Sequence, residues 1–160
     1  MSNQENNRYS PKNFIKGKIT ELVFDQMFRE AGQFTILPFG YERTLPELAQ
    51  YSSEVKYKPV LDNVRSAPDF VLISNDKTEV YMVEVKYRTN PSKADLIEIV
   101  EKIRDRWESI WIFLATPDGF YFDSCTNVVK KEGEIARLDF GWVPEDIQKK
   151  YLELMKEFIR

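Results

Sequence analysis

The strongest constraint on the fold is a pair of apolar stretches joined by a short polar turn near the middle of the chain. The first stretch covers residues 66–73, the second covers residues 79–88, and Asn75-Asp76 lies between them. Both are rich in β-branched and aromatic residues, which predicts two strands joined by a tight turn. The second stretch is apolar on both of its alternating faces. It is therefore expected to be a central strand, covered on both sides.

This second strand also carries an acid and a base where charges are costly. Glu84 and Lys86 share one face of the strand because strand side chains alternate. Desolvating a charge is expensive, and a simple ion pair between the two would be weak evidence for stability. Asp69 opens the neighbouring strand and can lie alongside Glu84. Two adjacent carboxylates repel unless a cation lies between them, which points to a hard divalent ion with oxygen ligands.

The composition limits the chemistry. The chain has 160 residues, no histidine, one cysteine and a net charge of -3. The absence of histidine excludes Ser-His and Cys-His catalysis and imidazole-based zinc sites. The single Cys125 excludes an internal disulfide, and no apolar run approaches membrane-spanning length. We expect a cytoplasmic protein with no membrane partner, made of a flexible tail (1–12) and a single domain (13–160).

A helix is predicted from about Asn13 to Ala31, with Gly32 as its stop. Its core stripe is expected to comprise Ile15, Ile19, Leu22, Val23 and Met27.

The adjacent stripe of this helix carries the candidate acids. Glu21 follows Gly17 by one turn, and Asp25 lies one turn further along. Glu21 is preferred as the helix acid because a glycine one turn before it allows backbone or substrate to approach closely. A solvated glutamate is the competing interpretation.

The remaining elements follow from local signals. A strand is expected over 33–39, and 42–65 reads as an insertion whose basic and aromatic residues could bind phosphates and bases. Ser92 with Asp95 predicts the start of an amphipathic helix, and 110–115 reads as a buried strand. Strand, helix and strand at this spacing predict a parallel βαβ unit.

Beyond this unit the signals are weaker. Pro117-Asp118 repeats the Pro-Asp pair in a turn, but no acid-x-Lys strand follows it, so it is treated as a decoy. A strand is expected over 120–123, and residues 127–129 and 135–140 are expected to pair as a late hairpin. A final helix is predicted from Pro144.

The element order, with Pro68-Asp69 and Glu84-Val85-Lys86, resembles the PD-(D/E)XK nuclease superfamily. The resemblance covers residues 13–115 and looks closest to archaeal Holliday junction resolvases and related small nucleases. It implies an α/β, restriction-endonuclease-like fold: an αβββαβ core whose central mixed sheet is flanked by helices, followed by C-terminal strands and a helix. It further implies a Mg²⁺-dependent nuclease that hydrolyses phosphodiester bonds of DNA in repair, recombination or restriction.

The resemblance also implies a role for each motif residue. Asp69 and Glu84 would hold one or two Mg²⁺ ions, for which Mn²⁺ is a substitute. The backbone carbonyl of Val85 would be a further ligand, and Glu21 would help directly or through water. Lys86 would orient or help deprotonate the attacking water, with an ion pair as its competing role.

Four further residues are expected to contact nucleic acid: Arg88, Lys93, Arg65 and Ser66. Cutting both strands of a duplex would favour a homodimer. Two alternatives stay open, namely a catalytically inactive nuclease-fold module that binds nucleic acid or a protein, and a purely structural network of the charged residues.

Overall fold

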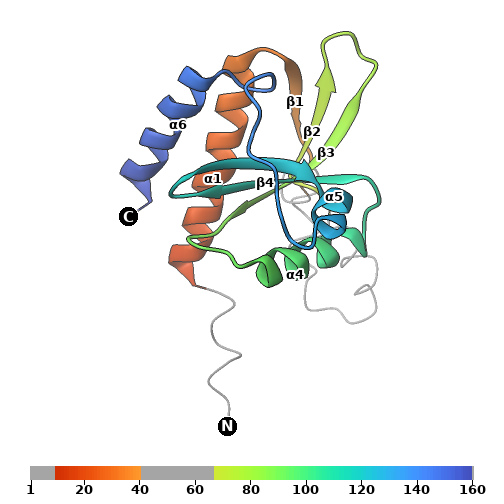
Figure 1. Cartoon of the computed structure of the whole chain (residues 1–160). Coiled ribbons are helices and arrows are strands. Elements are labelled where there is room, and N and C mark those ends of the chain that lie inside the picture. The colour runs from red at the N-terminus through yellow and green to blue at the C-terminus, as the bar shows by residue number, and fades with distance from the viewer. Residues whose placement is uncertain (1–9, 41–66, 160) are drawn as a thin grey trace, which may run out of the picture.

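The computed structural model describes residues 10–40 and 67–159, which form an α/β structure with a five-stranded mixed sheet between helices (Figure 1). The strands are β1 (Phe34–Pro38), β2 (Phe70–Ser74), β3 (Val80–Tyr87), β4 (Ile110–Thr116) and β5 (Gly119–Ser124). The helices are α1 (Pro11–Ala31), α4 (Lys93–Arg104), α5 (Cys125–Lys130) and α6 (Glu145–Phe158).

The strands lie in the order β1-β2-β3-β4-β5, so β3 is the central strand, as predicted. Neighbouring strands are antiparallel except β3 and β4, which are parallel and connected through α4. The predicted βαβ unit is therefore confirmed. In the β2–β3 pair, Phe70 lies opposite Val83, which brings Asp69 next to Glu84 in the register.

The two faces of the sheet bury separate apolar clusters. On one face, α1 and α6 pack against β3, β4 and β5 around Phe24, Phe28 and Phe113. The rings of Phe24 and Phe28 lie 4.5 Å apart, and that of Phe113 lies 5.0 Å from Phe24. On the other face, α4 and α5 cover the sheet through Leu96 and Val128. Both faces of β3 are thus covered.

Helix α1 ends at Gly32 as predicted, with a left-handed φ of 71°. The predicted core stripe needs correction, because Ile15 and Leu22 are 56% and 55% exposed. The helix is rotated so that Phe24 and Phe28 are fully buried, since these large rings remove more apolar surface from water.

Helix α4 begins at the predicted signal. The Ser92 side chain accepts a hydrogen bond from the Asp95 N–H, and the Asp95 carboxylate accepts one from the Ser92 N–H. This reciprocal capping box satisfies two backbone donors at the helix start.

The predicted late hairpin is wrong. Residues 125–130 form α5, which begins where the Ser124 hydroxyl accepts a hydrogen bond from the Asn127 N–H. Residues 135–140 contribute only an isolated bridge, between Arg137 and Tyr121 of β5. Cys125 and Val128 lie one turn apart and both face the α4 side of the core, so burial favours a helix there. Pro144 is the cap of α6 rather than its first helical residue.

Within the described ranges, no helix combines the length and apolar character that crossing a membrane requires. The predicted insertion at 42–65 lies outside the described residues.

Candidate active site

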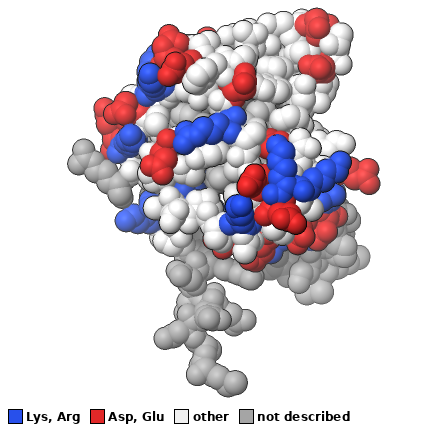
Figure 2. Space-filling view, in the orientation of Figure 1, with Lys and Arg blue, Asp and Glu red and all other residues white. Residues whose placement is uncertain are grey.

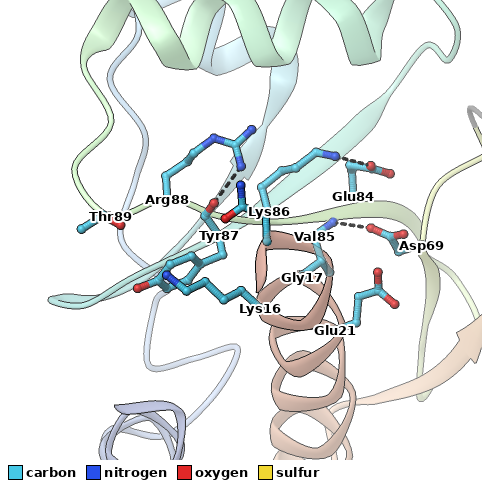
Figure 3. A pocket seen from close by; sticks show the side chains of 11 residues that line it. Lys16, Gly17, Glu21, Asp69, Glu84, Val85, Lys86, Tyr87, Arg88 and Thr89 are labelled. Carbon is cyan, nitrogen blue, oxygen red and sulfur yellow. Dashed lines mark hydrogen bonds and ion pairs between the residues drawn. The ribbon is translucent and has the colours of Figure 1, made fainter. Parts of the chain in front are cut away.

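A cleft of about 490 Å³ lies where β3 extends beyond its partner β2 (Figure 3). The β2–β3 pairing ends at Val83, so residues 84–87 of β3 have no β2 partner in the part of the chain that the structure describes. Helix α1 forms the opposite wall of this cleft. We call it the Asp69 cleft; its lining residues are Asn13, Lys16, Gly17, Glu21, Asp69, Glu84, Val85, Lys86, Tyr87, Arg88 and Thr89.

Asp69 is held against the part of β3 that extends beyond its pairing with β2. Its carboxylate accepts a hydrogen bond of 2.8 Å from the Val85 N–H. Burial, and after it the nearby charge of Glu84, raise the pKa of Asp69 to about 7. The Val85 N–H and the ammonium groups of Lys86 and Lys18 act in the opposite direction. Burial beside a second carboxylate therefore makes the ionised form of Asp69 costly in the folded protein.

Glu84 and Lys86 extend from the same face of β3, as predicted, and form an ion pair. The Lys86 Nζ lies 2.9 Å from a Glu84 carboxylate oxygen, and the two side chains are 32% and 17% exposed. Burial alone would lower the pKa of Lys86, but the charge and hydrogen bond of Glu84 and the charge of Asp69 outweigh it. The pKa of Lys86 therefore lies above its usual value, and the ammonium stays protonated at neutral pH.

Of the two candidate helix acids, Glu21 lines the cleft and Asp25 does not. Glu21 lies 3.4 Å from the Lys18 ammonium. Asp25 is buried and pairs at 2.7 Å with Arg29, whose guanidinium also donates to the Ile36 carbonyl. Asp25 thus anchors α1 to β1, and the preference for Glu21 agrees with the position of its side chain.

The cleft includes residues that the sequence interpretation missed. Lys16 lies over the Tyr87 ring at 5.7 Å, and Tyr87 lines the cleft while it also packs against the apolar core. Asn13 could have been found by extending the stripe of Gly17 and Glu21 back by one turn. No comparable signal marks Lys16.

The residues predicted to contact nucleic acid are only partly brought together. Arg88 lines the cleft and donates to the Tyr87 carbonyl at 2.7 Å. Lys93 does not line it and pairs with Glu134 at 3.1 Å. Arg65 and Ser66 lie outside the described residues.

The donor set of the cleft suits a hard divalent cation. Asp69 and Glu84 supply two carboxylates. The Val85 carbonyl points to the same side of β3 as the N–H that meets Asp69, because both groups of one strand residue face the same neighbour. Mg²⁺ keeps several waters and needs only one or two carboxylates. Among residues 10–40 and 67–159, no three acidic, cysteine or histidine side chains gather closely enough to hold a metal. Glu21 as a ligand therefore stays a prediction.

Comparison with protein-family models and with curated proteins gives no match for this chain. The residues of the cleft, and the sheet that positions them, are therefore the features from which a function can be inferred.

Gly17 gives a first testable prediction about the cleft wall. A Cβ built on Gly17 meets no atom within 4 Å, so Gly17→Ala should raise the free energy of unfolding by about 0.5–1 kcal/mol through helix propensity alone. Urea denaturation checks this. Gly133→Ala is the control and should lower the free energy of unfolding, because its Cβ would lie 2.5 Å from the Lys93 carbonyl oxygen and the backbone has a φ of 93°. A Gly17→Ala protein less stable than wild type would contradict the prediction.

Proposed function

We propose that this protein is a Mg²⁺-dependent nuclease of the restriction-endonuclease-like fold that hydrolyses phosphodiester bonds of DNA. One observation carries the proposal: Asp69, Glu84 and Lys86 meet in one cleft where the central strand extends beyond its pairing with β2 (Figure 3). A cluster of partly buried charges in a cleft, with one carboxyl pKa strongly raised, is typical of a catalytic site.

Each residue of the cleft would have a different role in such a reaction. Asp69 and Glu84 would hold Mg²⁺ or Mn²⁺ together with the Val85 carbonyl. When bound, the cation would supply a Lewis acid that activates water and stabilises negative charge on the phosphate. Lys86 would leave its ion pair with Glu84, orient the attacking water and neutralise charge as it develops on the phosphate.

Other groups of the cleft would position the substrate. Arg88 extends from the end of β3 on the side of Lys86 and would bind a neighbouring phosphate. Gly17 leaves the α1 wall without a side chain, so the nucleic-acid backbone could approach closely. Glu21 would order water on the opposite wall.

The fold gives this proposal analogical support only. The element order α1-β1-β2-β3-α4-β4 around a mixed sheet, with one acid directly before β2 and the other on β3, agrees with the nuclease-like core that the sequence resembles. Folds host many functions, so the residues of the cleft carry more weight than the architecture.

The alternative is an inactive module of the same fold that binds nucleic acid or a protein. The observation in its favour is the ion pair of 2.9 Å between Lys86 and Glu84, which satisfies both charges without a metal. This alternative predicts salt-sensitive DNA binding with no cleavage in any divalent cation.

The deciding experiment measures cleavage of labelled DNA in Mg²⁺, in Mn²⁺ and in EDTA, on duplex, branched and single-stranded substrates. We expect hydrolysis only with a divalent cation. Glu84→Gln should reduce the rate at least ~100-fold, since it removes one of two charged ligands.

Asp118→Asn is the matched control. It changes the second Pro-Asp pair of the chain, whose carboxylate is exposed in the β4–β5 turn, and should cleave like wild type. A wild-type protein without cleavage on every substrate, or a Glu84→Gln protein as active as Asp118→Asn, would overturn the nuclease proposal.

A further inference from the structure

A second hollow of about 280 Å³ adjoins the Asp69 cleft along α4. It shares Glu84, Lys86 and Arg88 with the cleft, so the two hollows meet at these side chains. We call it the α4 groove; its lining residues are Glu84, Lys86, Arg88, Ile99, Lys102, Ile103 and Arg106.

The α4 groove is basic although the whole chain carries a net charge of -3. Its lining has four basic side chains and one acidic side chain. The hollow beside the C-terminal end of α4 that Arg104 lines has the opposite balance, with Glu101, Asp105 and Glu108. On the face drawn in Figure 2, basic and acidic side chains are interspersed. Around α4, most of the basic side chains therefore line the hollow that adjoins the carboxylate site, and most of the acidic ones line the other hollow.

The spacing along α4 explains how the groove is built. Ile99 lies three and four positions before Lys102 and Ile103 on α4, so these three share one side of the helix, and Arg106 follows in the turn after the helix. The two isoleucines pack against the apolar cluster beneath α4, while Lys102 and Arg106 stay exposed.

Both basic groups are available to an anion. The Lys102 ammonium lies 2.9 Å from Glu98, but both side chains are more than two-thirds exposed, at 68% and 67%. Such a surface pair contributes little stability and can be exchanged for another anion. Arg106 offers a guanidinium, which binds phosphate through two parallel hydrogen bonds.

We propose that Lys102 and Arg106 form a phosphate-binding subsite that holds the DNA strand beside the phosphodiester positioned in the Asp69 cleft. This inference rests on the proposed function for the identity of the ligand. A DNA strand presents one negative charge at every nucleotide, and a strand whose phosphate lies against Lys86 would carry its neighbours along the basic lining of the groove.

The test compares two double variants that remove the same charge. Lys102→Gln/Arg106→Gln changes the groove. Lys149→Gln/Arg104→Gln is the control, because Lys149 forms a similar exposed pair with Glu145 at 3.0 Å and Arg104 lines the opposite hollow. Binding of fluorescent duplex DNA is measured in EDTA over a range of salt concentrations, and cleavage is measured separately with Mg²⁺.

We expect the groove variant to bind DNA at least ~10-fold more weakly. The slope of log K against log salt concentration should become shallower by about one to two, since each phosphate contact contributes about 0.9 to this slope. Its kcat at saturating DNA should stay within ~2-fold of wild type while KM rises. The control should change neither binding nor KM by more than ~2-fold.

The outcomes separate this inference from the nuclease proposal. Wild-type cleavage with equal DNA binding by both double variants would overturn the subsite alone. DNA binding that weakens only in the groove variant, without cleavage by wild type, would support the subsite and overturn catalysis. A wild-type protein that neither binds nor cleaves DNA would overturn both.

Discussion

Replacing Lys86 by methionine is expected to slow DNA cleavage by about 100- to 1000-fold, equivalent to ~3–4 kcal/mol of lost transition-state stabilisation. Methionine keeps the apolar stem of the side chain but lacks the ammonium that would face the phosphate. The loss should appear in kcat, because the charge is needed most when negative charge develops during the reaction. Single-turnover cleavage of duplex DNA with Mg²⁺ measures it.

Lys131→Met is the matched control for Lys86→Met. Lys131 lies 3.5 Å from the buried carboxylate of Asp123 and does not line the Asp69 cleft, so this change also removes a cation from a buried acid. Both variants should be less stable than wild type, but only Lys86→Met should cleave DNA more slowly. Equal cleavage by the two proteins would mean that Lys86 serves a structural network alone.

Replacing Asp69 by asparagine is expected to stabilise the metal-free protein above neutral pH by about 2–4 kcal/mol. Burial and the charge of Glu84 raise the pKa of Asp69 from 3.8 to about 7 in the folded state. From about pH 4 to 7, the folded protein therefore keeps a proton that the unfolded chain has lost. This contribution to stability is complete below pH 4 and disappears as the pH rises through about 7.

Asparagine does not titrate, so Asp69→Asn should lack this decline, and its side-chain oxygen can still accept the hydrogen bond from Val85. Urea denaturation in EDTA between pH 4 and 8.5 measures the difference. Asp76→Asn is the control of opposite sign, because hydrogen bonds from Ser74 and Thr78 lower the pKa of Asp76 to about 2. It should destabilise the protein at neutral pH. An Asp69→Asn protein less stable than wild type at pH 8 would contradict the prediction.

Mg²⁺ should reverse this order of stability. A ligand that binds only the folded state adds stability in proportion to the logarithm of its concentration over its Kd. Millimolar Mg²⁺ should therefore stabilise wild type and leave Asp69→Asn unchanged. If Asp69→Asn stabilised the metal-free protein but Mg²⁺ did not stabilise wild type, Asp69 would be a buried acid with a raised pKa that does not bind metal.

The sequence predicted the elements whose signals are local. The start of α4 depends on hydrogen bonds between Ser92 and Asp95, three positions apart, and such contacts form wherever those residues occur in a helix start. The pairing of β2 with β3 followed from two apolar runs around a turn, and this register alone brings Asp69 next to Glu84. The sequence alone therefore predicted that Asp69 and Glu84 lie side by side in the candidate site.

The same kind of reasoning gave a wrong prediction for the C-terminal region. Residues 125–130 are short and mixed in composition, so their pattern suits a strand as well as a helix. The helix is stabilised by its cap at Ser124 and by the burial of Val128 beneath α4, a contact between distant parts of the chain.

The sequence by itself determined the central strand, the parallel βαβ unit and the acid pair, because apolar patterns mark the strands, a connecting helix favours a parallel crossover, and one strand register places the two acids side by side. Only the tertiary structure decided which helical residues face the site. The burial of Phe24 and Phe28 sets the rotation of α1, which brings Glu21 to the cleft and turns the Asp25–Arg29 pair toward Ile36 of β1. Likewise, the packing of α4 on the sheet decides that Lys102 and Arg106 line the groove. Helix rotation is set by the whole buried surface, and no local pattern encodes it.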